Sequence, residues 1–197
     1  MIITYFRSSS FNTHSNCEQQ YFIEYVLGWR GKSNLKADKG TIVHKILEIL
    51  ALIKYHKQFQ HSEFEDDIVG KVQLKKYNLD DIILKVYNYY SQANDHHNWT
   101  DKDYRDCYDW TYKTINYNGG MFDPRNRDIV CPEQQFDFEI KKPWAKYIFD
   151  TPEGKISGNL ALKGTIDLIT KVDDNFYEII DWKTGRRLNW KIGRAHV

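Results

Sequence analysis

Two aspartates and a lysine interrupt an otherwise apolar stretch, residues 164–185, whose sequence is GTIDLITKVDDNFYEIIDWKTG. Two apolar runs are joined there by an acidic turn at residues 173–175, a pattern that predicts an antiparallel hairpin. With that turn, Asp167 stands directly opposite Asp181, and facing residues in such a pair have Cβ atoms about 5 Å apart. Because side chains alternate along a strand, Lys183 lies on the same face as Asp181. One hairpin therefore gathers two acids and one amine.

This group of side chains suits the hydrolysis of a phosphodiester. Two carboxylates at that distance repel each other, and burying either one without a partner is costly. A divalent cation removes the conflict, since carboxylate oxygens are ligands that Mg²⁺ and Mn²⁺ prefer. Such a cation would polarise a phosphate and lower the pKa of an attacking water, while the lysine orients that water or neutralises developing charge.

The alternative is a solvated surface hairpin in which Lys183 simply neutralises Asp181. Apolar residues flank the charges on both strands, and exposed strands rarely carry such runs. The flanking residues are Ile166, Leu168, Ile169, Ile179 and Ile180. They favour a buried hairpin with a functional face.

Composition describes an ordinary soluble chain that is long enough for one domain. It has 197 residues, of which 41% are hydrophobic and 28% charged, and its net charge of +1 argues neither for nor against nucleic acid. No signal-peptide layout and no run of membrane-spanning length is present, so no membrane partner is expected. The three scattered cysteines fit a reducing cytosol better than a disulfide scaffold.

The elements that must position the hairpin begin with helices. Apolar residues recur at helical spacing in NCEQQYFIEYVLG, which a glycine, Gly28, ends. Asp38 is predicted to cap the next helix, KGTIVHKILEILALIKYH, whose buried stripe is Ile42, Ile46, Ile49 and Ile53, widened by Val43, Leu47 and Leu50.

Residues 62–117 are expected to form two or three further helices, with the loop NDHHNWTD between two of them and Asn118-Gly119-Gly120 as the end. The pattern then changes to alternation and β-branched runs in EQQFDFEI, GNLALKGTIDLITK and NFYEIIDWK. The fold class is therefore α+β, a helical N-terminal half packed on a mixed β-sheet that contains the antiparallel hairpin.

The hairpin motifs resemble a known family. Gly164-x-x-Asp167 followed by IIDWKTG, residues 179–185, is similar to the core of the PD-(D/E)XK nuclease superfamily and closest to its RecB-like branch. The resemblance implies a restriction-endonuclease-like core in which Asp167 and Asp181 bind metal and Lys183 is the catalytic lysine. The peptide carbonyl of Trp182 would be a further metal ligand.

Two upstream blocks extend the resemblance. KGTIVHKILE resembles the branch's G-x-x-x-H helix motif, which implies that His44 is an additional metal ligand, and SSSFNTHSNCEQQYFIEYV resembles its opening helix. His44 lies almost opposite the apolar stripe, so a plain solvated histidine is the alternative. Gly40 and Ala51 share its side, a small-residue flank that would let the helix lie close over a sheet.

Further candidates surround this core. Glu133 and Glu48 are candidate helper carboxylates, although a surface charge explains either equally well, and Glu178 alternates onto the opposite face. Basic and hydroxyl groups near the hairpin are candidate DNA contacts, with a solvated face as the alternative. They are Lys163, Thr184, Arg186 and Arg187.

Some RecB-like nucleases hold an iron–sulfur cluster with one early cysteine and three after the core. Cys17 matches the early position, but Cys107 and Cys131 are misplaced for the others. We therefore expect a buried free cysteine at Cys17, with an iron–sulfur cluster completed by cysteines beyond residue 191 as the alternative. The branch's downstream helix, with a glutamine and a tyrosine one turn apart, is not found.

The last six residues, IGRAHV at 192–197, match what a common sequencing-adapter DNA encodes in one frame. We expect residues 1–191 to be a single nuclease domain and the natural chain to continue past Lys191, with residues 192–197 as an artefact.

The function expected from residues and resemblance together is a Mg²⁺- or Mn²⁺-dependent DNase, an exonuclease of a phage or bacterial recombination or repair system. Its partners would be DNA and a helicase or recombination protein, in the cytoplasm of a bacterium or a phage-infected host. One alternative is a non-catalytic, nuclease-like module that binds DNA or a helicase. Another is a helical scaffold with a chance D-x-K sequence.

Overall fold

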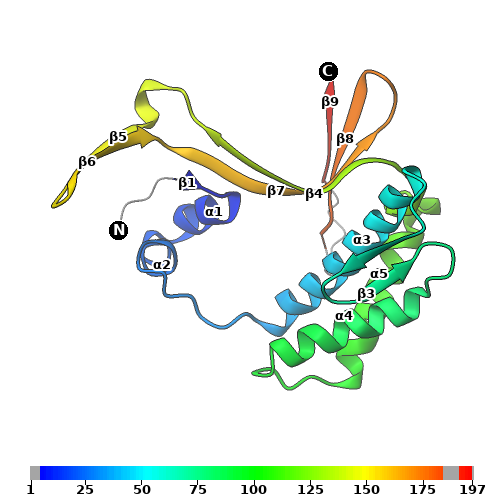
Figure 1. Ribbon diagram of the computed structural model, residues 1–197. Coiled ribbons are helices and arrows are strands. Elements are labelled where there is room, and N and C mark those ends of the chain that lie inside the picture. Colours follow the sequence, from blue (N-terminus) through cyan, green and yellow to red (C-terminus); the bar gives the residue numbers. More distant parts are fainter. Residues whose placement is uncertain (1–4, 184–190, 197) are drawn as a thin grey trace. The chain divides into compact units, whose positions relative to one another are not determined.

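The computed structural model describes residues 5–183 and the backbone of residues 191–196 (Figure 1). The chain divides into two compact units, each assembled from segments far apart in sequence. The first unit comprises residues 1–32 and 135–165, and the second comprises residues 33–134 and 166–197. Both units mix helices and strands, which confirms the predicted α+β class.

The first unit begins with short helical segments. Its elements are β1 Tyr5–Phe6, α1 Ser8–Asn16, α2 Glu18–Tyr21, the π-helical turn η1 Phe22–Val26, and the hairpin of β5 Lys146–Thr151 and β6 Gly154–Asn159. The predicted stop at Gly28 is confirmed, and its φ of 73° is one that glycine adopts readily. Cys17 has an extended backbone that separates α1 from α2, and the expectation that it is buried is wrong, because it is exposed.

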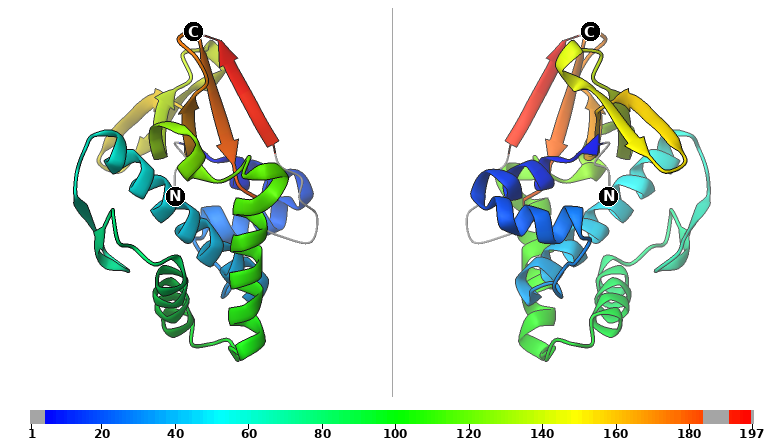
Figure 2. Two further views of the ribbon diagram at one scale, coloured as in Figure 1. Left: turned by 90° about the vertical axis from the view of Figure 1, so that its right-hand side faces the viewer. Right: turned by 90° about the vertical axis from the view of Figure 1, so that its left-hand side faces the viewer.

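The second unit is built around one long helix. Its helices are α3 Leu35–Gln58, α4 Leu79–Ala93 and α5 Asp101–Asn116, and α4 and α5 both pack on α3 (Figures 1 and 2). The predicted stripe on α3 is confirmed, since all seven of its residues are fully buried. The predicted cap is wrong. Asn34 caps α3 by accepting a hydrogen bond from the Ala37 backbone at 2.9 Å, so Asp38 lies inside the first turn.

A hairpin of β2 Glu63–Asp66 and β3 Gly70–Gln73 occupies part of the stretch that was expected to be helical. Phe64 faces Val72 across it, and both are buried while their strand neighbours Glu63 and Glu65 are exposed. This two-residue alternation suits a strand with one face on the core. The rest of the prediction is confirmed, because α4 and α5 flank the loop at residues 94–100.

The main sheet has five strands in the order β1-β7-β8-β9, with β4 also pairing with β7. β1 is parallel to β7, whereas β7, β8 and β9 are antiparallel, so the sheet is mixed as predicted. The strands other than β1 are β4 Asp128–Glu139, β7 Ala161–Lys171, β8 Phe176–Asp181 and β9 Lys191–His196. β9 includes most of the segment predicted to derive from an adapter, and that origin stays a prediction.

The register of the β7–β8 hairpin matches the prediction. Leu168 pairs with Ile180 and Lys171 with Tyr177, and the Val172 backbone N–H closes the turn by donating to the Phe176 carbonyl at 2.9 Å. The same register continued by one residue sets Asp167 opposite Asp181.

One apolar core holds this hairpin to α3. Leu168, Ile180 and Trp182 belong to the same buried cluster as the α3 stripe, together with residues from α4 and α5. Each fully buried Leu or Ile contributes about 2–3 kcal/mol relative to an exposed one. The core therefore fixes the helix and the hairpin that carry the predicted site.

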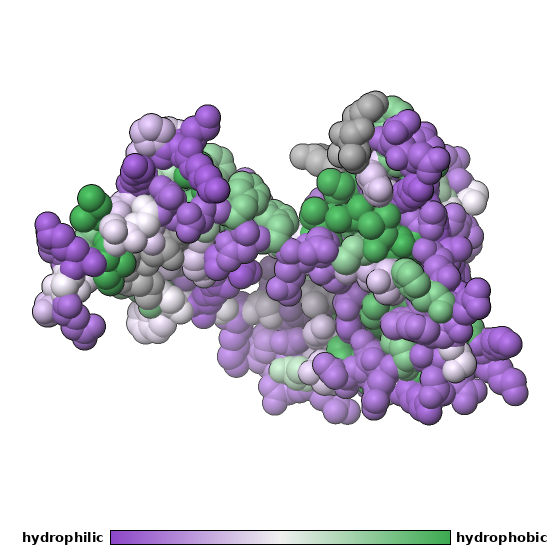
Figure 3. All heavy atoms as spheres, turned by 45° about the horizontal axis from the view of Figure 1, so that its top comes forward, coloured by the Kyte–Doolittle hydropathy of each residue, from purple (hydrophilic) through white to green (hydrophobic). Residues whose placement is uncertain are grey.

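In the view of Figure 3, hydrophilic residues (purple) cover most of the face shown, interrupted by smaller apolar patches (green). Among the described residues, no helix combines the length and the apolar character needed to cross a membrane.

Candidate active site

The N-terminal half of α3 forms one wall of a cleft of about 660 Å³ in the second unit. Strands β4 and β7 and helix α4 supply the other lining residues. The cleft is lined by Asn34, Lys36, Ala37, Gly40, Thr41, His44, Lys45, Glu48, Tyr90, Glu133 and Asp167. It thus brings together predicted site residues from three segments that are far apart in sequence.

His44 and Asp167 lie close together in this cleft. Asp167 directs its side chain away from the core because its neighbour on β7, Leu168, is fully buried on the other face. His44 Nδ1 lies 3.6 Å from Asp167 Oδ2, longer than a hydrogen bond, and the Trp182 backbone N–H donates to the same oxygen at 2.7 Å. The buried Trp182 ring meets the His44 ring edge-on, with centroids 6.3 Å apart. The tryptophan therefore positions both groups.

Asp181 and Lys183 lie beside this pair, at the end of β8 and just beyond it. The Lys183 ammonium contacts Asp181 Oδ1, and the two side chains are 54% and 38% exposed. Asp181 acts electrostatically on both Asp167 and His44. The two hairpin acids, the lysine and the histidine of the predicted site thus share one locality.

Burial favours the uncharged forms of Asp167 and His44. It raises the pKa of Asp167, against the opposing effects of His44 and of the Trp182 backbone N–H. It also lowers the pKa of His44, although Asp167 acts in the other direction. A neutral imidazole keeps a free ring nitrogen, the form in which histidine binds metal ions.

Glu133 adds a third carboxylate from β4. Its backbone φ of 49° is unusual for a residue other than glycine, and such conformations occur often at functional sites. Burial and the negative charges of Glu48 and Asp167 raise its pKa to about 7. Glu48 itself pairs with Lys45 Nζ at 2.9 Å, and that ammonium is shared with Asp66, also at 2.9 Å.

These residues fit a divalent cation. Carboxylate oxygens with one imidazole nitrogen are a donor set that Mn²⁺ accepts, and Mg²⁺ binds through the carboxylates alone. Burial raises the pKa of Asp167 and of Glu133, so their charged forms are poorly solvated and a bound cation would stabilise them. Lys45 compensates little, because its ammonium is held by Glu48 and Asp66.

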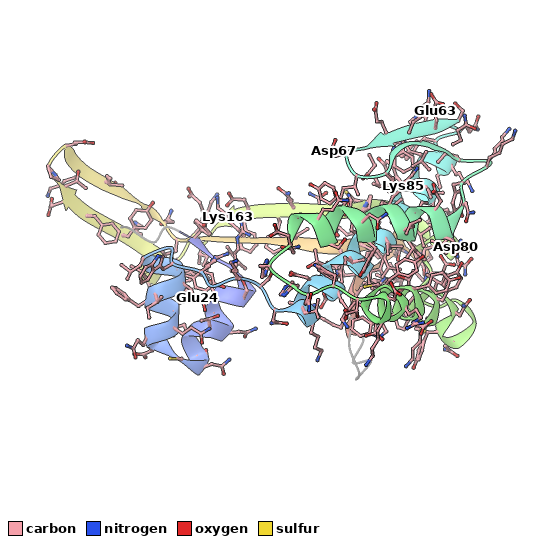
Figure 4. All side chains as sticks on the ribbon, turned by 90° about the horizontal axis from the view of Figure 1, so that it is seen from below. Glu24, Glu63, Asp67, Asp80, Lys85 and Lys163 are labelled. Atoms are coloured by element: carbon pink, nitrogen blue, oxygen red, sulfur yellow. The ribbon has the colours of Figure 1, made fainter. Side chains whose placement is uncertain are left out.

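Of the predicted DNA contacts, one lies in the first unit and three lie outside the described residues. Lys163, labelled on β7 in Figure 4, belongs to the first unit, where its ammonium pairs with Asp137 at 2.7 Å and lies over the Tyr5 ring. Thr184, Arg186 and Arg187 lie outside the described residues.

The sequence analysis excluded one further residue from the site and did not predict two others that line the cleft. Glu178, placed by alternation on the face opposite Asp181, is buried with Arg127 Nη1 at 3.3 Å from its carboxylate. Tyr90 and Lys45 line the cleft, and neither was expected there. For Lys45 a signal existed, since it neighbours His44 and lies three residues before Glu48 on the same helix.

An α+β fold with a helical histidine and one hairpin acid in a cleft, and with the second hairpin acid and a lysine two residues after it beside that cleft, defines the nuclease class with the PD-(D/E)XK core. The family model of the PD-(D/E)XK nuclease superfamily matches residues 8–196, and the chain belongs to this superfamily. Its restriction-endonuclease-like fold is the one predicted. Comparison with curated proteins and with solved structures gave no match.

Proposed function

We propose that the protein is a Mg²⁺- or Mn²⁺-dependent DNase of the RecB-like branch, acting as an exonuclease in phage or bacterial recombination or repair. One observation carries the proposal: His44, Glu133 and Asp167 line a single cleft, and Asp181 and Lys183 are next to it. Membership in a nuclease superfamily supports the same reaction class.

The residues that would hold the cation are His44, Asp167, Asp181 and the carbonyl of Trp182, with Glu133 and Glu48 as helpers. A bound divalent cation would supply charge to the phosphate and lower the pKa of an attacking water. Trp182 fixes Asp167 through its backbone N–H, so this carboxylate is already oriented.

Lys183 supplies a positive charge that can exchange its present partner for a phosphate. Its side chain is 54% exposed and makes a contact with Asp181 that solvent reaches. Exchanging that partner for a phosphate oxygen costs little, since exposed ion pairs are worth at most about 1 kcal/mol. The ammonium then stabilises the charge that develops on the phosphate or orients the water. Removing one such group typically costs about 100- to 1,000-fold in rate.

The start of α3 offers groups that can bind an anionic strand. Lys36 and Thr41, from the first turns of α3, line the cleft together with Asn34. A lysine there neutralises one phosphate, and the helix N-terminus adds favourable partial positive charge.

The test is degradation of end-labelled linear and circular DNA with Mg²⁺, Mn²⁺ or EDTA. Wild type is compared with Asp181→Asn and with Asp174→Asn, a matched control in the exposed turn of the same hairpin, where the acid only pairs with Lys171. Loss of linear DNA alone, dependent on metal and reduced at least about 100-fold in Asp181→Asn but not in Asp174→Asn, supports the exonuclease.

Other outcomes of the same assay redirect the proposal. Cutting of circular DNA would show that the same site acts as an endonuclease and not as an exonuclease. If folded wild-type protein cuts neither substrate with either metal, the catalytic proposal fails. DNA binding without cutting would then favour a non-catalytic module that acts with a helicase or recombination protein.

A further inference from the structure

A second cluster of metal-binding side chains lies in the same unit, outside the cleft. Asp38 in the first turn of α3 meets His96 and His97 from the loop at residues 94–100 between α4 and α5. One ligand atom from each residue lies within 4.8 Å of the others. The histidine pair is part of the loop NDHHNWTD, to which the nuclease site assigns no role.

The contacts in this cluster are close. His97 Nε2 lies 2.7 Å from Asp38 Oδ2, and the Ser33 hydroxyl donates to the same oxygen at 2.6 Å. His96 Nε2 lies 3.3 Å from the Ser33 carbonyl oxygen. The two imidazole rings have centroids 4.0 Å apart. Two imidazoles and a carboxylate therefore offer ligand atoms within 4.8 Å of one another, and a backbone carbonyl lies beside His96.

Burial makes a bound cation favourable there. The side chains of Asp38 and His97 are only 9% and 12% exposed, so water solvates the carboxylate poorly. The adjacent lysine, Lys39, contributes little charge, because its ammonium is held by Asp103 at 2.9 Å and Asp106 at 2.7 Å. His96 is half-buried, which leaves an approach from solvent.

The cluster is distinct from the nuclease cleft. Asp38 and His44 are six positions apart on α3, which is about 9 Å along the axis and about 120° around it. The residues that line the cleft include none of Asp38, His96 and His97.

We propose that Asp38, His96 and His97 form a second metal site, selective for a first-row transition-metal ion such as Zn²⁺. Two imidazole nitrogens and one carboxylate oxygen are three of the four ligands of a tetrahedral zinc site, and the Ser33 carbonyl or a water completes it. Mg²⁺ prefers oxygen ligands and competes poorly for this donor set.

The bound ion ties the α4–α5 loop to the start of α3. Asp38 and His97 are 59 residues apart in sequence, and one ion would link the two elements that carry them. α3 continues directly to Gly40, Thr41 and His44, which line the cleft. The site therefore stabilises the helix turn that precedes the nuclease residues, and it is structural rather than catalytic.

The simpler alternative is a hydrogen bond between Asp38 and His97 that holds the loop without any metal. His96→Gln separates the two, because it leaves the Asp38–His97 contact and the hydrogen bond from the Ser33 hydroxyl to Asp38 unchanged, and removes only the His96 imidazole beside the Ser33 carbonyl. If the pair only holds the loop, this substitution should leave Zn²⁺ affinity unchanged, whereas a metal site loses a ligand and binds Zn²⁺ more weakly.

The experiment is a Zn²⁺ titration of the EDTA-treated full chain by calorimetry, with excess Mg²⁺ present to occupy the cleft. Thermal denaturation with and without one equivalent of Zn²⁺ provides a second readout. Wild type is compared with His96→Gln, His97→Gln and Asp38→Asn. His56→Gln is the matched control, since His56 also contacts another histidine, His61, with ring nitrogens 2.8 Å apart at the far end of α3.

We expect one equivalent of Zn²⁺ to bind wild type and His56→Gln and to raise the unfolding temperature of both. Loss of a ligand should weaken binding at least about 100-fold in His96→Gln, with normal folding in the absence of metal. Equal Zn²⁺ affinity in wild type and His96→Gln would overturn the proposal, as would no binding to folded wild-type protein.

Discussion

Replacing Glu133 by glutamine should stabilise the metal-free protein above pH 7 and have no such effect at pH 4. Burial, Glu48 and Asp167 raise the pKa of Glu133 from its ordinary 4.5 to about 7. The folded state therefore holds this proton more tightly than the unfolded state does. The resulting loss of stability begins as pH rises through about 4.5 and is complete above about 7. Glutamine, which carries no charge, avoids that loss.

The magnitude follows from the shift. The difference between 4.5 and about 7 corresponds to about 3 kcal/mol if the group were fully shielded from solvent. The Glu133 side chain is only half-buried, so solvent screening reduces the effect to about 1–2 kcal/mol. The change from glutamate to glutamine preserves shape and leaves the backbone at φ 49°.

The assay is urea denaturation at pH 4 and pH 8, in EDTA and in excess Mg²⁺, with Glu65→Gln as the control for an exposed carboxylate on β2. In EDTA at pH 8 the free energy of unfolding of the variant should exceed that of wild type by about 1–2 kcal/mol, and at pH 4 the two should agree. Mg²⁺ should stabilise wild type more than the variant, because the cation binds only the folded site. An equal difference at both pH values, or a less stable variant at pH 8 in EDTA, refutes the reasoning.

Other perturbations test the packing around the site by the same urea measurements. Lys39→Met should destabilise the folded protein by about 3 kcal/mol, because it leaves the buried Asp103 carboxylate without its cation. Lys85→Met removes an exposed ion pair on α4 and should change stability by less than about 1 kcal/mol. Equal losses in the two variants would contradict the burial argument. Ile46→Ala should lower the free energy of unfolding by about 2–5 kcal/mol, since the Ile46 side chain is fully buried in the core. A loss under about 1 kcal/mol would contradict this packing. Gln60→Gly should stabilise by up to about 1 kcal/mol by relieving a φ of 60°, and destabilisation would show that the side chain matters there.

The sequence predicted the hairpin well because its determinants are local. A short acidic turn and strict alternation define the register, so Leu168 pairs with Ile180 and Asp167 reaches the end of β8 beside Asp181. The buried stripe of α3 was likewise predictable from helical periodicity alone, since each of its residues faces the core.

The errors arose where tertiary contacts outweigh local preference. Asp38 has a good capping side chain, but Asn34 caps the helix one turn earlier and Asp38 bonds instead to His97, 59 positions away. Residues 62–117 alternate apolar clusters with charge, which predicted helices throughout, but residues 63–73 form the β2–β3 hairpin. The burial of Phe64 and Val72 against the core favours strands there.

Part of the site depends on distant segments as well. Glu133 reaches the cleft from β4, and Lys163 is held by Asp137 within the first unit, which no local pattern predicts. The sequence could identify both residues as charged groups near the core motifs, but their partners come from the folded chain.

The central claim is that the cleft acids and His44 bind a divalent cation, and Mn²⁺ binding followed by electron paramagnetic resonance tests it most directly. Wild type, Asp167→Asn and the turn control Asp174→Asn are titrated with Mn²⁺ at pH 8. The account predicts that Asp167→Asn weakens Mn²⁺ binding at least about 10-fold while Asp174→Asn binds as wild type does. Equal Mn²⁺ binding by all three proteins would contradict it.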